Sequence, residues 1–235
     1  MTKQRLGPPS GSRDFPPDEA LFRQRVLETV RAAFVRHGFA PIETPAFERL
    51  ETLSGKYGDE GEKLIFKILK RGDKAASGEA DLALRYDLTV PTMRMYAHRR
   101  NDLPRVVKRY QIGPVWRADR PGRGRFREFH QCDVDIIGSA SPLADVEVLL
   151  ALAAAIDDLG LGRFTIRLNS RRVIAGLMEA YGVPPDRQAE VSVVLDKADK
   201  IGHGGVAEAL SGIGLPNMAA ARLVADLTAQ DWAAA

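Results

Sequence analysis

The stretch Val115–Gly138 reads VWRADRPGRGRFREFHQCDVDIIG and joins an arginine-rich loop to an alternating strand. Pro121, Gly122 and Gly124 allow the backbone to turn tightly between the arginines. A planar guanidinium binds phosphate through two parallel hydrogen bonds, so several of them on one short loop favour a bound anion. A solvated basic loop would have the same composition, and the arginines alone leave that alternative ahead. The five arginines are Arg117, Arg120, Arg123, Arg125 and Arg127.

Residues 129–137 alternate between polar and apolar side chains, as a half-covered strand does. A sheet with one open face would leave the polar row in water, but the helices of this chain are numerous enough to cover both faces. Acids on a covered face need a cationic partner, because burial of an unpaired carboxylate is costly. The predicted polar row is Phe129, Gln131, Asp133 and Asp135, and the predicted apolar row is His130, Cys132, Val134 and Ile136. The same alternation in LALRYDLTV, residues 82–90, predicts a second polar row of Arg85, Asp87 and Thr89.

The composition indicates a globular chain. Its 235 residues are 45% hydrophobic, which suffices for one large domain or two small ones. The single cysteine, Cys132, excludes a disulfide within the chain, and the four histidines lack ligand spacing, so no metal site is predicted. No apolar run approaches the roughly 20 residues of a membrane helix, and the N-terminus lacks the apolar segment of a signal peptide. We therefore expect a cytoplasmic protein without a membrane partner.

Positive charge is concentrated in residues 94–127, although the net charge of the chain is only +3. This segment holds eleven Lys or Arg residues and two acids. Such a block indicates either a solvated surface or a polyanionic partner, and composition alone weights these two alternatives about equally.

The pattern along the chain predicts an α+β fold with an antiparallel sheet flanked by helices. Apolar residues at helical spacing predict a helix over residues 16–38. Two pairs of extended runs, 64–70 with 81–90 and 105–117 with 129–137, predict two hairpins. Residues 39–47, FAPIETPAF, contain too much proline for a central strand and predict an edge segment. Further predictions are a helix at 142–159 capped by Ser141, a short strand at 164–169, and helices beyond Pro184.

Two long segments are the most specific part of the sequence: LALRYDLTVP at 82–91 and RYQIGPVWRADRPGRGRFREFHQCDVDIIG at 109–138. With TPAFE at 44–48 and VLDKADKIG at 194–202, they resemble the N-terminal part of a class II histidyl-tRNA synthetase. The likeness covers nearly the whole chain. Asp at positions 87 and 135, where other members have Glu, resembles the eukaryote-like branch. The resemblance implies a class II aminoacyl-tRNA synthetase-like catalytic core over residues 1–183, and the start of a helical insertion region over 184–235.

The resemblance also assigns roles to the polar residues. Asp87 and Asp135 would accept the ammonium and imidazole groups of histidine, and Gln131 would add a hydrogen bond. Arg117 would contact the substrate carboxylate and the α-phosphate of ATP, which makes it the candidate catalytic residue. The implied histidine-binding set is Asp87, Leu88, Thr89, Arg117, Gln131 and Asp135. The implied ATP-binding set is Arg117, Asp119, Arg125 and Phe129, with Phe129 stacked on adenine.

The implied activity is that of a histidine–tRNA ligase, which activates histidine with ATP and transfers it to tRNA(His). ATP with Mg²⁺ is then a co-substrate, and no prosthetic group is expected. The segment around Pro45 resembles the one that builds the homodimer interface of the family. We find neither the family's motif 3 nor its anticodon-binding domain in these 235 residues, so the implied catalytic core is incomplete.

Two other functions stay open. A non-catalytic relative, similar to the regulatory subunit of ATP phosphoribosyltransferase, would keep the fold but sense histidine. It would have less need of the arginine-rich loop, so that loop favours the ligase. A bare RNA-binding module would explain the basic block but not the polar rows, and it ranks last.

Overall fold

The computed structural model describes residues 6–168 and 170–228. The chain divides into two compact units, Met1–Arg163 and Phe164–Ala235. The division lies within the segment expected to form one core over residues 1–183, so residues 164–183 belong with the helices that follow them. Residues 229–235 of the expected insertion region lie outside the described residues.

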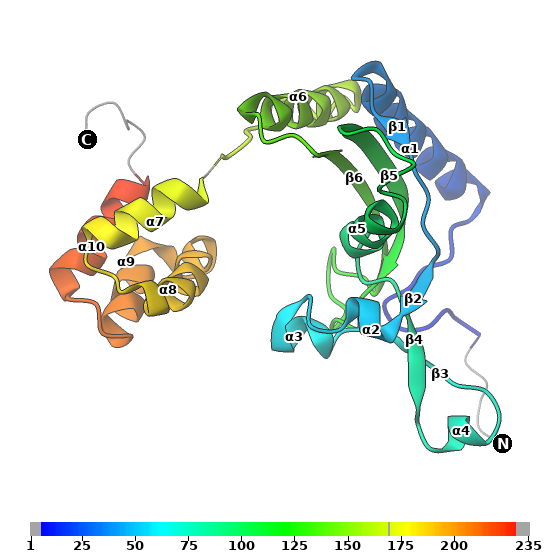
Figure 1. The fold of residues 1–235 in the computed structure, drawn as a ribbon, viewed down its shortest axis with the longest axis horizontal. Coiled ribbons are helices and arrows are strands. Elements are labelled where there is room, and N and C mark those ends of the chain that lie inside the picture. The colour runs from blue at the N-terminus through cyan, green and yellow to red at the C-terminus, as the bar shows by residue number, and fades with distance from the viewer. Residues whose placement is uncertain (1–5, 169, 229–235) are drawn as a thin grey trace. The chain divides into compact units, whose positions relative to one another are not determined.

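A long antiparallel hairpin forms the centre of the first unit (Figure 1). Its strands are β5 (Val107–Trp116) and β6 (Glu128–Ile137), and the register runs from Val107 opposite Ile137 to Trp116 opposite Glu128. The arginine-rich loop joins their ends, as the sequence predicts. The short strand β1 (Ala40–Pro41) pairs in parallel with β5 at the edge of this sheet, which confirms an edge segment there.

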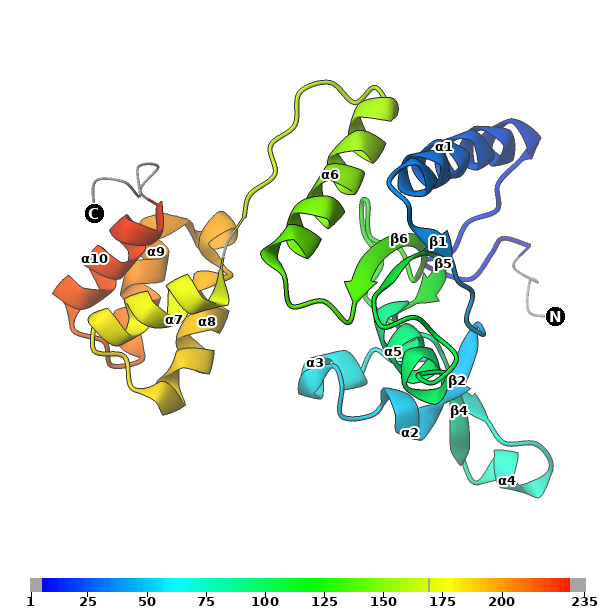
Figure 2. The same cartoon turned by 45° about the horizontal axis from the view of Figure 1, so that its top comes forward.

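Two helices cover one face of the hairpin, α1 (Pro17–Arg36) and α6 (Pro142–Asp158) (Figure 2). The side chain of Ser141 accepts a hydrogen bond from the backbone N–H of Leu143, so the predicted helix cap is confirmed. The apolar row of β6 packs into the core beneath these helices, which confirms the predicted sorting of its two faces. That core contains Val30, Ala33, Phe34, Phe39, Tyr110, Ala151 and Ala155, with Ile112, Cys132, Val134 and Ile136 packed against it.

A second small antiparallel sheet has the order β2-β4-β3. Its strands are β2 (Phe47–Arg49), β4 (Ala80–Leu84) and β3 (Lys67–Leu69). The predicted pairing of 64–70 with 81–90 is therefore confirmed in part. Around these strands lie three short helices, α2 (Leu50–Leu53), α3 (Gly58–Glu62) and α4 (Asp73–Ala76).

The predicted strand over residues 81–90 is wrong beyond Leu84. Thr89 is the first residue of helix α5 (Thr89–His98), so Arg85, Asp87 and Thr89 do not form one row on a strand. The reason is local: the Asp87 carboxylate accepts a hydrogen bond from the backbone N–H of Val90, which starts a helix instead of extending a strand.

The second unit is a small bundle of helices. The described helices are α7 (Arg171–Ala180), the 3₁₀ turn η1 (Pro185–Arg187), α8 (Gln188–Leu195), α9 (Ala198–Gly212) and α10 (Asn217–Thr228). Their core includes Met178, Val191, Val206, Leu210 and Leu223. The helices predicted beyond Pro184 are confirmed, but residues 164–168 form no strand. Alternation alone cannot make a strand, because each strand needs a neighbour for its backbone hydrogen bonds.

Candidate functional site

The face of the hairpin opposite α1 and α6 carries the polar row. Residues directly opposite in an antiparallel pair share a face, so the register places Arg109 beside Asp135, Gln111 beside Asp133, and Gly113 beside Gln131. The segment that leads into α5 reaches this face, because the backbone N–H of Leu88 donates a hydrogen bond of 3.2 Å to Oε1 of Gln131. The predicted residues Leu88 and Gln131 are thus joined, although they are 43 positions apart.

Asp87 lies just before α5 and is held by two donors. Its Oδ1 accepts a hydrogen bond of 3.0 Å from the hydroxyl of Tyr57 and one of 3.1 Å from the N–H of Val90. Burial, and then the neighbouring Asp87 carboxylate, raise the pKa of Tyr57 well above its ordinary value, so the hydroxyl stays protonated as a donor. The ring of Tyr57 also packs against that of Tyr86, with centroids 4.3 Å apart.

Arg117 follows β5 and is oriented by two aromatic rings. Its Nε donates a hydrogen bond of 3.1 Å to the carbonyl of Tyr86. Its guanidinium carbon lies 4.4 Å from the ring centroid of Tyr86 and 5.2 Å from that of Phe129, within the range of cation–π attraction. A guanidinium has five N–H donors, so four remain beyond the one that Nε uses. The side chain is therefore oriented and still able to bind an anion.

The arginine-rich loop is closed by its own hydrogen bonds. The backbone of Arg117 donates to the carbonyl of Arg127 at 2.9 Å, and a turn pairs Gly122 with Arg125. Arg125 Nη2 lies 2.7 Å from Oδ1 of Asp119, and Arg127 Nε donates to the carbonyl of Asp119 at 2.9 Å. The side chain of Asp119 is nearly buried, whereas that of Arg125 is 68% exposed. This ion pair joins two of the residues expected at the ATP site.

Arg109 is a charged residue of this face that sequence reasoning missed. It is fully buried and forms an ion pair with Asp135. Desolvation lowers the pKa of Arg109, and the carboxylates of Asp135, Asp133 and Asp87 oppose that shift. The pKa of Asp133 is raised by burial, while Arg109 acts in the opposite direction. The alternation of the strand could have indicated it, because Arg109 and Gln111 are two positions apart on β5 and their side chains therefore lie on the same face. Tyr57 was also missed, and nothing near it in the sequence points to Asp87.

The structure places six of the predicted residues in contact with one another, as three pairs. Leu88 meets Gln131, Arg117 meets Phe129, and Asp119 meets Arg125. Asp133 interacts electrostatically with Asp135, Asp87 and Arg117. We call the carboxylates of Asp87, Asp133 and Asp135 the acidic cluster. Thr89 starts α5, and the side chain of Leu88 is fully buried.

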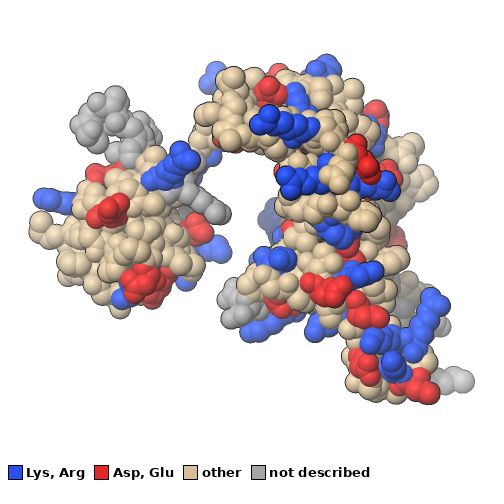
Figure 3. Space-filling view, viewed as in Figure 1, with Lys and Arg blue, Asp and Glu red and all other residues tan. Residues whose placement is uncertain are grey.

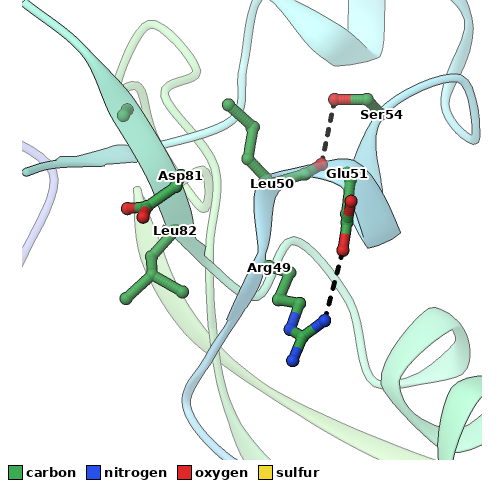
Figure 4. A pocket seen from close by; sticks show the side chains of 7 residues that line it. Arg49, Leu50, Glu51, Ser54, Asp81 and Leu82 are labelled. Carbon is green, nitrogen blue, oxygen red and sulfur yellow. Dashed lines mark hydrogen bonds and ion pairs between the residues drawn. The ribbon is translucent and has the colours of Figure 1, made fainter.

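A separate hollow of about 500 Å³ lies beside β4 and α2 and contains none of the predicted site residues (Figure 4). Two polar contacts lie within its lining: Arg49 lies 3.4 Å from Glu51, and the hydroxyl of Ser54 donates to the carbonyl of Leu50 at 2.9 Å. Nothing in its lining suggests reaction chemistry. Among the described residues, no cluster of His, Cys, Asp or Glu could hold a metal ion by itself.

The basic block is partly neutralised in the folded chain. Acidic side chains lie among the Lys and Arg side chains over the first unit (Figure 3). Within residues 94–127, five cations have acidic partners, namely Arg94, Arg99, Lys108, Arg109 and Arg125. The folded segment therefore carries less unpaired positive charge than its composition suggests. Among the described helices, none has both the length and the apolar character that crossing a bilayer demands.

The model of the family described as "Histidyl-tRNA synthetase" matches residues 11–231. The chain belongs to the histidyl-tRNA synthetase family. A histidine–tRNA ligase of Gloeobacter violaceus is 46% identical over 227 residues, which cover 89% of this chain and 49% of that protein. One of Cytophaga hutchinsonii is 44% identical over 231 residues, covering 92% of this chain and 51% of that protein. The chain spans about half the length of these curated relatives.

Solved structures agree with the family assignment. The crystal structure of histidyl-tRNA synthetase from a Nostoc species has a TM-score of 0.82 and 29% identity, covering 97% of this chain and 50% of that one. A Bacillus halodurans structure, described as an ATP phosphoribosyltransferase regulatory subunit/histidyl-tRNA synthetase, has a TM-score of 0.79 at 24% identity, covering 96% of this chain and 56% of that one, and supports the fold alone. The expected α+β fold of an incomplete class II catalytic core is confirmed.

The expectation of a eukaryote-like branch is not supported, because the similar curated ligases are bacterial. Asp at positions 87 and 135 differs from Glu only by one methylene group. The choice between the two acids therefore carries little information about lineage.

Proposed function

We propose that this chain carries the histidine- and ATP-binding part of a histidine–tRNA ligase, which activates histidine with ATP and transfers it to tRNA(His). The observation that carries the proposal is Arg117, oriented by Tyr86 and Phe129 within electrostatic range of the acidic cluster on the polar face of the hairpin. An oriented cation beside several carboxylates suits a substrate with one acidic and two basic groups, and histidine is such a molecule.

The histidine pocket comprises residues of the polar face and of the start of α5. Asp87 and Asp135 receive the ammonium and imidazole groups, and Thr89 and Leu88 complete the wall. Gln131 already accepts from Leu88 through Oε1, so its amide NH₂ is the part that donates to the substrate. The substrate carboxylate binds Arg117, opposite the acids.

The nucleotide site comprises Arg117, Phe129 and the arginine-rich loop. Phe129 stacks on adenine, with Asp119 near the adenine amino group and Arg125 near the phosphates. Arg125 is 68% exposed in its ion pair with Asp119, and such pairs contribute little stability. Exchange of that partner for a phosphate therefore costs little free energy. Mg²⁺ enters with the ATP phosphates as part of the co-substrate.

The reaction needs no side-chain nucleophile. A carboxylate oxygen of histidine attacks the α-phosphorus of ATP, the bond from that phosphorus to the bridging oxygen breaks, and pyrophosphate leaves. The terminal ribose hydroxyl of tRNA then attacks the carbonyl carbon of the adenylate, and AMP leaves. Arg117 stabilises the negative charge that develops on the α-phosphoryl oxygens, and positioning supplies the rest of the rate enhancement.

We also propose a cytoplasmic homodimer that uses the segment around Pro45. Pro45 and Phe47 are exposed, and Phe47 is 53% exposed on the edge strand β2. An exposed aromatic on an unpaired strand edge favours a second chain as partner.

The decisive experiment is histidine-dependent exchange of pyrophosphate into ATP, with calorimetric binding of histidine and ATP to the same 235-residue chain. Exchange that requires histidine supports the ligase. Binding of histidine without ATP binding or exchange would favour the histidine-sensing alternative. A folded chain that binds neither ligand would refute the proposal for this chain.

A further inference from the structure

A fully buried guanidinium lies beneath the acidic cluster of the hairpin. Arg109 is 0% exposed, and its Nη2 forms an ion pair with Oδ2 of Asp135. Within the described part of the chain, neither its Nε nor its two terminal nitrogens has a hydrogen bond of good geometry. Burial of a cation costs free energy unless nearby carboxylates compensate its charge. We therefore ask which acids surround Arg109.

Three carboxylates interact electrostatically with Arg109, and they come from two parts of the first unit. Asp135 and Asp133 lie on β6, and Asp87 lies before α5. Arg109 and Arg117 are the cations that act on Asp133. The cluster therefore has more negative than positive groups even with both arginines present. That imbalance suits a cationic ligand, provided that the carboxylates do not protonate instead.

The two oxygens of Asp135 differ in their surroundings. Its Oδ2 is buried against the guanidinium, while the side chain as a whole is 36% exposed. Oδ2 is thus held by Arg109, and the exposed part of the carboxylate is Oδ1. An anchored oxygen fixes the plane of the carboxylate, since a planar group held at one end has little freedom left.

Resting on the proposed function, we propose that Arg109 is a positioning residue for histidine recognition, which holds Asp135 so that its exposed oxygen meets a cationic group of the substrate. Arg109 does not touch the substrate, because its nitrogens are covered. Its effect passes through Asp135 and through the charge balance of the cluster.

The charge balance predicts a specific pH dependence. Asp133 already has a raised pKa through burial, and Arg109 is the main opposing cause, so removal of Arg109 raises that pKa further. A cationic substrate is favoured by an ionised Asp133 carboxylate, so its affinity falls as the pH falls through the pKa of Asp133. Without Arg109, the loss of affinity therefore begins at a higher pH. The groups that face Asp133 are Arg109, Asp135, Asp87 and Arg117.

The test compares Arg109→Met, which removes the charge, with Arg109→Lys, which retains it. Histidine and ATP affinities are measured by calorimetry between about pH 5.5 and 8.5, and the Asp133 carboxyl is titrated by NMR. We expect Arg109→Met to weaken histidine binding about 10- to 100-fold, the range seen when a partner that orients a binding group is removed. ATP affinity should change less than about twofold, and Arg109→Lys should recover part of the loss. The control is Arg94→Met, which removes an arginine paired with the buried Glu48 elsewhere in the same unit.

A double-mutant cycle with Asp135→Asn separates positioning from general destabilisation. In the Asp135→Asn background, Arg109→Met should cause a clearly smaller loss of histidine affinity than in the wild type, because the part of its effect that passes through Asp135 is then absent. The double variant also removes both charges of the buried pair, so it supplies a folded comparison if Arg109→Met alone does not fold.

The outcomes distinguish this inference from the proposed function. A wild-type chain that binds no histidine overturns the proposed function and this inference with it. A wild-type chain that binds histidine, together with an Arg109→Met variant of unchanged affinity and unchanged Asp133 titration, overturns only the role of Arg109. Equal losses in the wild-type and Asp135→Asn backgrounds also overturn it, because Arg109 would then act independently of Asp135.

Discussion

The hydroxyl of Tyr57 donates a hydrogen bond of 3.0 Å to the Asp87 carboxylate, and so a residue before α3 supports a residue at the start of α5. The same oxygen accepts from the N–H of Val90, so Asp87 is held from the protein side by two donors. In the proposed function, the other oxygen, Oδ2, is the one that meets a cationic group of the substrate.

Tyr57→Phe should therefore weaken both the fold and histidine binding. Loss of one hydrogen bond costs about 1 kcal/mol of unfolding free energy, and more where the acceptor is charged. The folded-state pKa of Tyr57 is raised above 10.0, so its contribution is fully present below about pH 10 and is lost as pH rises further. Urea denaturation of both proteins between pH 7 and 11 checks this. A difference in unfolding free energy that stayed constant up to pH 11 would contradict the predicted linkage.

Arg117→Ala should reduce adenylate formation by about 100-fold or more, on the magnitude typical for loss of one group that stabilises transition-state charge. Pyrophosphate exchange at saturating histidine measures the change. Arg25→Ala is the matched control, since Arg25 is an exposed arginine on α1, away from the polar face of the hairpin. Near-normal exchange by Arg117→Ala, or an equal loss in the control, would exclude the proposed role.

His130 should make the chain sensitive to mild acid. Burial, and then the nearby Arg23, lower the pKa of His130, and Arg23 Nη2 lies 3.0 Å from its Nδ1. A lowered folded-state pKa means that the stability contributed by neutral His130 is present above about pH 6.5 and is lost as pH falls below it. Denaturation at pH 5 and 7.5 should show a smaller pH effect for His130→Gln than for wild type. Equal pH effects would show that other groups cause the acid sensitivity.

Gly138→Ala should destabilise the first unit by about 1–3 kcal/mol. Gly138 has φ +91°, and an added Cβ would collide with the carbonyl oxygen of Arg105 at the end of the hairpin. Gly122→Ala is the control, because a Cβ there meets no heavy atom within 4 Å and its φ is not positive. Thermal unfolding of both variants measures the difference, and equal midpoints would show that the backbone near Arg105 relaxes at little cost.

The sequence by itself determined those features that depend on neighbours along the chain. The alternation in β6 sorted its apolar and polar rows correctly, since successive side chains of a strand point to opposite faces. The helix signals were similarly local, as the cap by Ser141 shows. A long run of specific motifs also identified the family, and residues 11–231 match it.

Only the tertiary structure decided which of these groups meet. The pairing of Arg109 with Asp135 follows from the strand register, and that of Tyr57 with Asp87 from the fold around α5. The strand expected over residues 81–90 ends at Leu84, because Asp87 satisfies a backbone donor that a strand would have paired elsewhere. Local patterns report the preferences of single elements, whereas contacts between elements depend on the packing of the whole unit. The strand alternation could place Arg109 on the polar face, but its ion pair with Asp135 became known only with the fold.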